Sequence, residues 1–576
     1  MNSSERGRNR ILLIAVGLAV LCLVAYWNTL HGEFQFDDER LILLNYSLQD
    51  LTHWRRILLF EPFRPVLLLT FALNYEIGGR DPFSYHVGNV ALHAGNSVLF
   101  FLLLLRFRMA GRDACPTDAG GNSAHLLYSA LAAALFAVHP LNTEAVSYIS
   151  GRSIVLCAFF YLLSLLFFDS YLRKGRWVDL LLFTIPLSLG LFTKEEAAMI
   201  PVAVLLYNLF FFGTESVKKH RSLHAVLIVM VVSAAVFRLY AEWKYAGLSL
   251  SSFPVYITTE IFIWLRYFWL AAYPIPLNVD HEIAPLSFSS PAFWLSLTVV
   301  ASLFWLLWNF RRAQPVFVFW GWWFFMNVLP SSVIPLPDFM AEHRVYISMF
   351  GFCGALGYLV LLFPKREDTH SRILSFVLVF LVLFFTAATI HRNRVWADQL
   401  SLWYDTVQKS PGKARPHINL GYALYLRKAY DEAIQEYFIA LSIKPDLPLI
   451  YNGLGLCFLK KNDFKQAEQS FDEALRIDPS YADAKTGKGL IRFRQGRYNE
   501  ALSYFQQSYA KRYGSAQLNA LLGICYLRTG QAQKAAELIN GTIHLHPKLQ
   551  QAGEAMQKGE LQTAERILEE LTNWSQ

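Results

Sequence analysis

Long apolar runs fill the first two thirds of the chain and end near residue 390. From Ile11 to Ile390 short polar loops separate these runs, whereas charged residues are frequent from His391 onward. A helix crosses a bilayer with about 20 apolar residues, so the pattern predicts a membrane part followed by a soluble part. Composition excludes a wholly soluble enzyme, because 54% of the 576 residues are hydrophobic and 17% are charged, against about 25% charged in soluble domains.

Eleven segments have the apolar character of membrane-spanning helices. The first follows three arginines and could also be a signal peptide, but no small-residue cleavage pattern follows it, so an uncleaved span is expected. The predicted spans are 10–29, 87–106, 125–139, 153–171, 178–193, 197–213, 223–240, 292–310, 316–330, 346–363 and 373–390.

Basic clusters between the spans predict the orientation, because Lys and Arg gather in cytoplasmic loops. With eleven spans every cluster is cytoplasmic, and everything after Ile390 is extracytoplasmic. The apolar stretch 256–273 carries Glu260 and Arg266; as a twelfth span it would place the last two clusters outside, so a re-entrant or interfacial helix is expected. The clusters are Arg6–Arg10, Arg106–Arg112, Arg173–Arg176, Lys218–Arg221, Arg311–Arg312 and Lys365–Arg366.

The net charge of +8 is typical of such loops and does not indicate nucleic acid. No segment joins a basic stripe to base-stacking aromatic residues. No nucleic-acid partner is therefore expected.

Prolines recur in the last third at the period of tetratricopeptide repeats. This helical repeat has a period of about 34 residues. Pro411, Pro445 and Pro479 follow one another at single periods, and Pro547 stands two periods further on. Small residues and aromatic or apolar residues recur with them, so that two helices can touch closely and a large side chain fills the next gap. The recurring residues are Gly421, Gly455, Gly489 and Gly523, then Ala433, Ala467, Ala501 and Ala535, then Tyr437, Phe471, Phe505 and Ile539.

Two domains follow from these patterns. Residues 1–391 are predicted to be a transmembrane domain and residues 392–576 an extracytoplasmic repeat domain. Such arrays bind peptides or proteins in a concave groove; a spacer role is the alternative. The repeats are expected at 414–447, 448–481, 482–515 and 516–549, with a half-repeat at 392–410 and a cap at 550–573.

An acidic loop follows the first span. Asp37, Asp38 and Glu39 stand together just outside the predicted membrane boundary. Carboxylates in this position suit a general base or the ligands of a divalent metal ion such as Mg²⁺ or Mn²⁺. A solvated turn is the alternative. Asp37 and Asp38 are the candidate catalytic residues and the candidate metal ligands.

Further ionisable side chains gather at the same predicted outer ends of the spans. Charge at membrane depth is costly, which makes these residues functional candidates. His86, Asn89, His93 and Asn96 share one helix face, which must line a cavity or bond to other helices; His86, near the outer mouth, is the better site candidate. The candidate substrate-binding residues are Arg64, His86, His139, Glu144, Arg152, Lys194, Glu195, Glu342, His343, Arg344 and Tyr346.

Carboxylates, cations and apolar walls together suit a lipid-linked phosphate donor. A carboxylate would deprotonate an acceptor hydroxyl, which attacks the anomeric carbon of a sugar as lipid phosphate departs. Cations such as Arg152, Lys194 and Arg344 would neutralise the departing phosphate. Because no nucleotide is expected outside the membrane, the donor is expected to be carried by a lipid.

The order and spacing of these residues resemble the transmembrane and tetratricopeptide-repeat (TMTC) O-mannosyltransferase family of the GT-C class of membrane glycosyltransferases. The C-terminal repeats complete the resemblance, which covers nearly the whole chain. The motifs that carry it are Phe36-Asp37-Asp38, Arg64-Pro65, Leu69-Thr70-Phe71, Asn74-Tyr75, Tyr85-His86, Asn89, Leu92-His93, His139-Pro140, Thr143-Glu144-Ala145-Val146, Gly151-Arg152, Lys194-Glu195, Glu342-His343-Arg344 and Tyr346.

The resemblance implies an all-α molecule: a polytopic GT-C-type helical bundle with about eleven spans, followed by a tetratricopeptide α-solenoid. It implies transfer of a sugar from a polyprenyl phosphate to a protein Ser or Thr, with Asp37 or Asp38 as base or metal ligand and the repeats engaging the acceptor. About four repeats is short for a eukaryotic member, which favours a bacterial inner membrane and an undecaprenyl carrier over the endoplasmic reticulum and dolichol. A non-enzymatic scaffold for envelope proteins and a ligase or polymerase of lipid-linked glycans are the alternatives.

Overall fold

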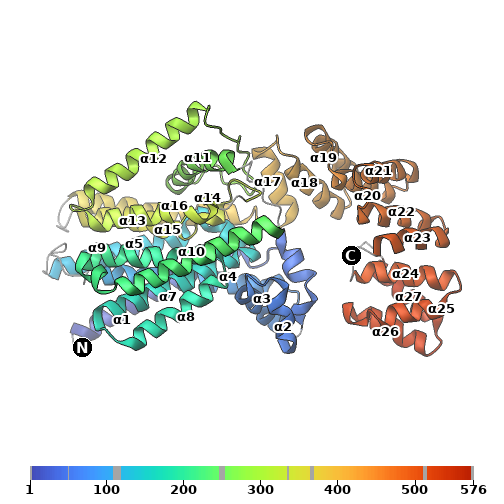
Figure 1. The fold of residues 1–576 in the computed structure, drawn as a ribbon, viewed down its shortest axis with the longest axis horizontal. Coiled ribbons are helices and arrows are strands. Elements are labelled where there is room, and N and C mark those ends of the chain that lie inside the picture. The colour runs from blue at the N-terminus through green and yellow to red at the C-terminus, as the bar shows by residue number, and fades with distance from the viewer. Residues whose placement is uncertain are drawn as a thin grey trace. The chain divides into compact units, whose positions relative to one another are not determined.

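In the computed structural model all secondary structure of the described residues is helical, and the chain divides into two compact units (Figure 1). The membrane unit is Met1–Leu402 and the repeat unit is Trp403–Gln576. The predicted basic cluster Lys365–Arg366 and most of Arg106–Arg112 lie outside the described residues. The structure describes residues 3–49, 51–107, 119–245, 253–333, 336–362, 369–509 and 515–572.

Within the described residues, seven helical segments are long and apolar enough to cross a membrane, so the chain is an integral, multi-pass membrane protein. There are eight if a bent pair, which turns by 51° at its break, is one span. The seven contain α1 (Ser3–Tyr26), α4 (Pro82–Arg106), α7 (Arg152–Lys174), α9 (Ile200–Lys219), α12 (Pro291–Phe310), α13 (Pro315–Met326) with α14 (Leu329–Val333), and α16 (Thr369–Asn393), and the bent pair joins α5 (Ala119–Val138) to α6 (Thr143–Ser147).

Three of the eleven predicted spans correspond to helices outside this set. The segments 178–193 and 346–363 overlap α8 (Trp177–Leu191) and α15 (Ser348–Tyr358), with 15 and 11 residues. At about 1.5 Å per residue, α8 is roughly 22 Å long, shorter than a hydrocarbon core of about 30 Å. The third, 223–240, lies in α10 (Arg221–Tyr245). The count of eleven therefore stays a prediction.

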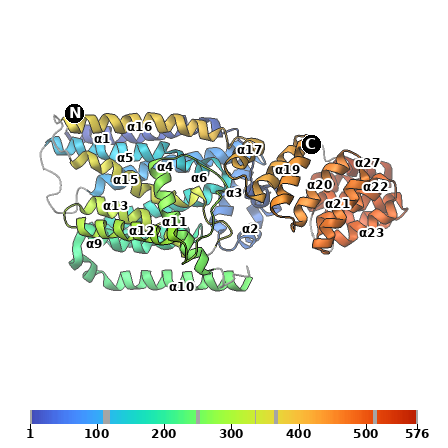
Figure 2. The same cartoon turned by 90° about the horizontal axis from the view of Figure 1, so that it is seen from above.

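The stretch 256–273 forms α11 (Phe253–Ala272), which is not among the candidate spans of the described residues. It packs against α12 and α14. The long helices of the membrane unit run side by side, and α2 (Trp54–Phe60) and α3 (Pro65–Gly78) lie at the end away from the N-terminus (Figures 1 and 2).

Aromatic side chains form the centre of the membrane unit. Phe100 of α4 packs against Trp320 of α13 and Phe350 of α15, with ring centroids 5.6 and 4.9 Å apart. A Cβ atom on Gly354 would stand 2.7 Å from the Trp320 ring, so α13 and α15 approach closely because this residue has no side chain.

The polar stripe of α4 bonds to neighbouring helices. Asn96 donates to the carbonyl of Val155 and to the hydroxyl of Tyr346, and His93 Nδ1 lies 2.6 Å from that hydroxyl. Asn89 donates to carbonyls that precede α7. The stripe thus forms hydrogen bonds between buried polar groups of neighbouring helices. Its spacing had allowed either this role or the lining of a cavity.

The repeat unit is a series of antiparallel helix pairs. A pair begins at Ala414, Pro448, Ala482 and Ala516, the first residues of the four expected repeats. The unit begins within α17 (Gln399–Lys409) and continues with α18 (Ala414–Leu426), α19 (Tyr430–Ile443), α20 (Pro448–Lys460), α21 (Phe464–Ile477), α22 (Ala482–Arg494), α23 (Tyr498–Tyr509), α24 (Ala516–Arg528), α25 (Ala532–Asn540), α26 (Pro547–Gln557) and α27 (Leu561–Thr572).

Glycines let the aromatic residue of each repeat fill the space between helices. Phe471 of α21 is fully buried, and a Cβ on Gly455 of α20 would approach its ring to 2.5 Å. Gly487 in the next repeat also has this ring as its nearest neighbour. One aromatic side chain therefore joins two successive repeats, which explains why both residue types recur once in every repeat.

Candidate active site

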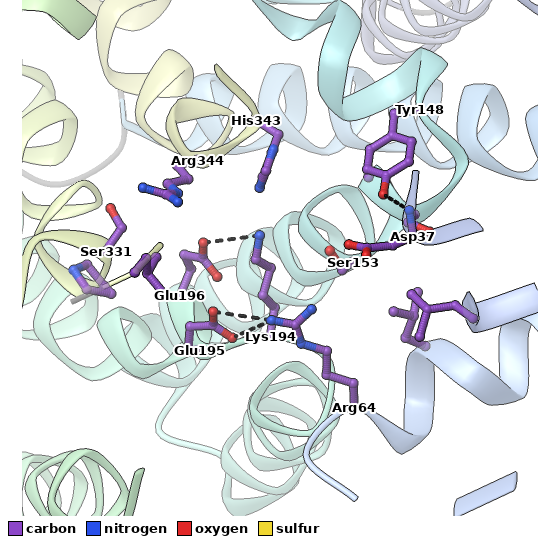
Figure 3. A pocket seen from close by; sticks show the side chains of 16 residues that line it. Asp37, Arg64, Tyr148, Ser153, Lys194, Glu195, Glu196, Ser331, His343 and Arg344 are labelled. Atoms are coloured by element: carbon purple, nitrogen blue, oxygen red, sulfur yellow. Dashed lines mark hydrogen bonds and ion pairs between the residues drawn. The ribbon is translucent and has the colours of Figure 1, made fainter. Parts of the chain in front are cut away.

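A pocket of about 190 Å³ in the membrane unit gathers residues from five separate stretches of sequence (Figure 3). Six of the residues predicted for the site line it: Asp37, Arg64, Lys194, Glu195, His343 and Arg344. The remaining lining residues are Leu41, Leu67, Tyr148, Ser150, Gly151, Ser153, Glu196, Pro330, Ser331 and Leu336.

The two candidate aspartates face different surroundings. Asp37 is exposed in the pocket, and its backbone N–H donates to the Tyr148 hydroxyl at 3.1 Å. Asp38 is fully buried behind it: Oδ2 accepts from the Gln35 N–H at 2.9 Å, and Oδ1 accepts from the N–H and hydroxyl of Ser150. Burial raises the pKa of the Asp38 carboxyl to about 7, although these donors act against the rise. Asp37 alone presents a carboxylate to the pocket from this loop.

Two cations and two glutamates form another part of the pocket wall. Arg64, which precedes α3, lies 3.3 Å from a Glu195 oxygen, and Lys194 Nζ lies 3.4 Å from Glu196 Oε1 (Figure 3). The side chains of Lys194 and Glu196 are both nearly buried, at 5% and 4% exposure. The tight turn between α8 and the short helix Glu195–Met199 presents all three charges of residues 194–196 to one cavity.

The third cation is held by the backbone. Arg344 Nη1 donates to the carbonyls of Asp338 and Phe339 at 3.0 and 3.1 Å. Within the described residues, no carboxylate lies within ion-pair distance of this guanidinium. Arg344 is therefore a fixed positive group in the pocket wall.

A buried carboxylate orients the pocket histidine. Glu144 of α6 lies 2.6 Å from His343 Nδ1 and accepts the backbone N–H groups of Glu342 and His343 at 2.8 and 3.3 Å. Glu144 thus fixes the short helix Glu342–Val345 as well as the imidazole ring. Burial first, and then the cations around it, hold the pKa of His343 well below its usual value.

Arg152 is buried behind the pocket. Its guanidinium donates to Asn89 at 2.7 Å and to the carbonyl of Tyr85 at 2.7 Å, and it stacks on Phe71. It thus ties α3, α4 and α7 together, whereas its neighbour Gly151 lines the pocket.

Four other predicted residues bind protein groups. The His86 and His139 rings contact the carbonyls of Gly32 and Ala271 at 3.2 and 2.9 Å. Glu342 accepts from the Asn278 N–H and lies 3.0 Å from His281 Nε2, while the Tyr346 hydroxyl meets α4. None of the four is among the lining residues of this pocket.

The structure does not bring the two candidate metal ligands, Asp37 and Asp38, into a cluster of metal-ligating side chains within the described part of the chain. Both Asp38 oxygens accept from protein donors. No three His, Cys, Asp or Glu side chains among the described residues could hold a metal ion together. The metal site therefore stays a prediction, and the chemistry below uses no metal ion.

Sequence reasoning missed several lining residues. Glu196 follows two predicted site residues, and this adjacency was the available signal. Tyr148, Ser153 and Ser331 are uncharged residues at or near helix ends, so charge at membrane depth could not single them out.

Comparisons with known proteins agree with this arrangement. Tetratricopeptide repeat families match residues 421–462, 448–481 and 492–558. The chain is 26% identical to the Caenorhabditis elegans "Protein O-mannosyl-transferase F38B6.6" over 477 residues, which cover 77% of this chain and 64% of the relative. It is 24% identical to the human "Protein O-mannosyl-transferase TMTC4" over 498 residues, or 74% of this chain and 65% of that protein.

The chain is a homologue of the TMTC protein O-mannosyl-transferases. A shorter alignment reaches 36% identity with mouse "Protein O-mannosyl-transferase TMTC2" over 165 residues, 26% of this chain and 18% of that protein. This TMTC homologue spans less than two thirds of the length of the relatives described. It combines candidate membrane spans with C-terminal tetratricopeptide repeats, as expected from the motifs.

Proposed function

We propose that this protein is a GT-C-class membrane glycosyltransferase that moves a sugar from a polyprenyl phosphate to a protein Ser or Thr hydroxyl. Its homology to protein O-mannosyl-transferases supports this function. The single observation that carries the proposal is the pocket in which Asp37, Arg64, Lys194 and Arg344 meet.

The cations account for binding of the phosphate. Arg344 is fixed by two carbonyls and is available to a phosphate oxygen, while Lys194 and Arg64 stand beside Glu196 and Glu195. A phosphodiester carries one negative charge before transfer, and the released lipid phosphate carries about two. Positive groups in a pocket of low dielectric therefore stabilise the transition state more than the ground state.

Asp37 is proposed to contact the reacting centre. A carboxylate there either takes the proton of the acceptor hydroxyl or stabilises the positive charge that develops on the sugar ring. Asp38 supports the loop from behind, because its oxygens bind Gln35 and Ser150.

The orientation belongs to the same proposal. With eleven crossings, α8, α10 and α15 included, and with the basic clusters in the cytoplasm, the N-terminus is cytoplasmic and the pocket and residues 392–576 lie outside the cytoplasm. The repeats would then hold the acceptor protein on the side where the sugar is transferred. A cysteine at the exposed position Gln495 should react with an impermeant thiol reagent in intact cells or spheroplasts; protection there would contradict this orientation.

Transfer by the purified full-length protein tests the function. The protein in lipid nanodiscs would receive radiolabelled undecaprenyl- or dolichyl-phosphate mannose and Ser/Thr-containing peptides, with products read by mass spectrometry. Glycoproteins and lipid-linked sugars of a strain lacking the gene give the cellular counterpart. No transfer together with an unchanged set of glycoproteins would leave a scaffold, and sugar on a lipid-linked glycan would indicate a ligase or polymerase.

Two arginine variants, one in the pocket and one outside it, sharpen this test. We expect Arg344→Gln to lower transfer by a factor on the order of 10² to 10³, as for loss of one group that stabilises a developing anion. Arg394→Gln is the matched control, because Arg394 is exposed and lies outside the pocket. Equal transfer by both variants would remove Arg344 from the proposed phosphate site.

A further inference from the structure

The pair formed by Glu144 and His343 has the geometry of an oriented base. The Glu144 side chain is 6% exposed, and its carboxylate lies 2.6 Å from His343 Nδ1. When Glu144 is ionised, its carboxylate only accepts hydrogen bonds, and Nδ1 then carries the hydrogen in this contact. Glu144 also accepts hydrogen bonds from two backbone N–H groups, and these bonds keep its carboxylate turned toward the His343 ring.

The other ring nitrogen is left for the pocket. His343 lines the pocket, and its ring points into it from the side that also carries Arg344 (Figure 3). Among the described residues, none makes a hydrogen bond to Nε2. A neutral imidazole with hydrogen on Nδ1 presents an unprotonated Nε2, which accepts a proton or a hydrogen bond.

We propose that His343 is the catalytic residue that takes the proton of the acceptor hydroxyl, and that Glu144 is its positioning residue. This inference rests on the proposed glycosyl transfer. The O–H bond of the acceptor breaks and the proton moves to Nε2. The hydroxyl oxygen bonds to the anomeric carbon, and the bond from that carbon to phosphate breaks with its electron pair on the phosphate oxygen. Asp37 is then left to stabilise positive charge on the sugar.

The charged groups that face His343 explain how substrate would control this base. Lys194, Arg344 and Arg64 disfavour the imidazolium, whereas Glu195 favours it, and Glu144 contacts the ring directly. Together these charges favour the neutral ring before substrate binds. The phosphate of a bound donor offsets the three cations, and departure of the lipid phosphate adds a further negative charge as the proton arrives.

The pH dependence of transfer tests this assignment. The purified full-length protein in nanodiscs would be assayed with polyprenyl-phosphate mannose and a Ser/Thr peptide from pH 4 to 9. We expect the rate to fall at acid pH, with the midpoint of kcat at higher pH than the midpoint of kcat/KM, because donor binding favours the imidazolium. His343→Gln should lose this acid limb and lower kcat by at least about 100-fold.

Glu144→Gln provides the second variant. It should lower kcat by a factor on the order of 100, because the ring loses its fixed tautomer. It should also move the acid midpoint to lower pH, because the imidazolium loses an anionic partner. A merely structural role would lower the amount of folded protein and leave the midpoint unchanged. His417→Gln is the matched control, since the His417 ring lies 2.6 Å from the Glu436 carboxylate in the repeat unit and does not line the pocket, and it should keep the wild-type midpoint.

The outcomes separate the two proposals. Absence of transfer by the wild-type protein overturns the proposed function and this inference together. Transfer by the wild type with an acid limb that persists in His343→Gln overturns the inference alone. If the acid limb of the pH profile instead disappears in Asp37→Asn, the Asp37 carboxylate is the base and the inference is also overturned.

Discussion

The pocket of the membrane unit and the helix contacts of the repeat unit are built in opposite ways. In the repeat unit one contact, an aromatic ring against glycines, recurs at the same place in successive repeats. In the pocket, the partners Glu144 and His343 are 199 residues apart, and Arg64 and Glu195 are 131 apart. A repeated local contact stabilises a fold, whereas a single long-range contact places one functional group.

Changes at Asp37 should give the largest difference between the units. Asp37→Asn is expected to lower sugar transfer by at least about 100-fold, because the pocket loses its exposed carboxylate. Thermal unfolding of the purified protein should be unchanged, since Asp37 is exposed. Glu39→Gln, an exposed carboxylate in the same loop, is the control and should transfer normally; equal rates in both variants would contradict the site.

A change at Phe471 should lower the stability of the repeat unit and leave the membrane unit folded. Phe471→Ala removes a fully buried ring that joins two repeats and is expected to cost about 3 to 5 kcal/mol. Limited proteolysis of the full-length protein in nanodiscs should cut the repeat unit first and leave the membrane unit intact. Gln469→Ala is the exposed control on the same helix, and similar cleavage of both variants would contradict the packing argument.

The pH dependence of stability should distinguish Asp38 from an exposed aspartate. Its folded-state pKa is raised to about 7, while an unfolded aspartate has a pKa of about 4. Between these values the unfolded chain binds fewer protons, so stability should fall as pH rises, by at most about 1.4 kcal/mol per pH unit, and level off above about pH 8.

The measurement is the melting temperature in detergent between pH 5 and 8. Asp38→Asn should lower stability overall and flatten the slope. Asp81→Asn, at an exposed position that caps α4, should leave the slope as in the wild type. An unchanged slope in Asp38→Asn would mean that another group titrates.

The smallest effect is expected at an exposed ion pair between repeats. Lys461 pairs with Asp431, and their side chains are 40% and 75% exposed. Lys461→Ala should change the stability of the repeat unit by less than about 1 kcal/mol, because water screens such pairs. Denaturant melts at low and high salt measure this; a larger loss would show that surface charge contributes more to the array than its packing suggests.

The repeats could be predicted closely from sequence because their contacts are periodic. The number of spans was harder to predict, since α8 and α15 are short and mean hydropathy does not distinguish a short span from a buried helix. For the site, charge near the predicted outer boundary indicated Lys194 and Arg344, and both residues line one pocket. The same signal also included Arg152 and Glu342, whose charged groups bind Asn89 and His281 and so connect helices and loops.

The sequence by itself determined that the chain has a multi-span membrane part and a tetratricopeptide array, because hydrophobicity and period are properties of neighbouring residues. Only the tertiary structure decided which polar residues face a common cavity. Asp37 and Asp38 are adjacent in sequence, yet one carboxylate is exposed in the pocket and the other binds Ser150 from a distant segment. Similarly, the proposed role of His343 depends on Glu144, whose position opposite Nδ1 arises from packing of α6 against the short helix Glu342–Val345.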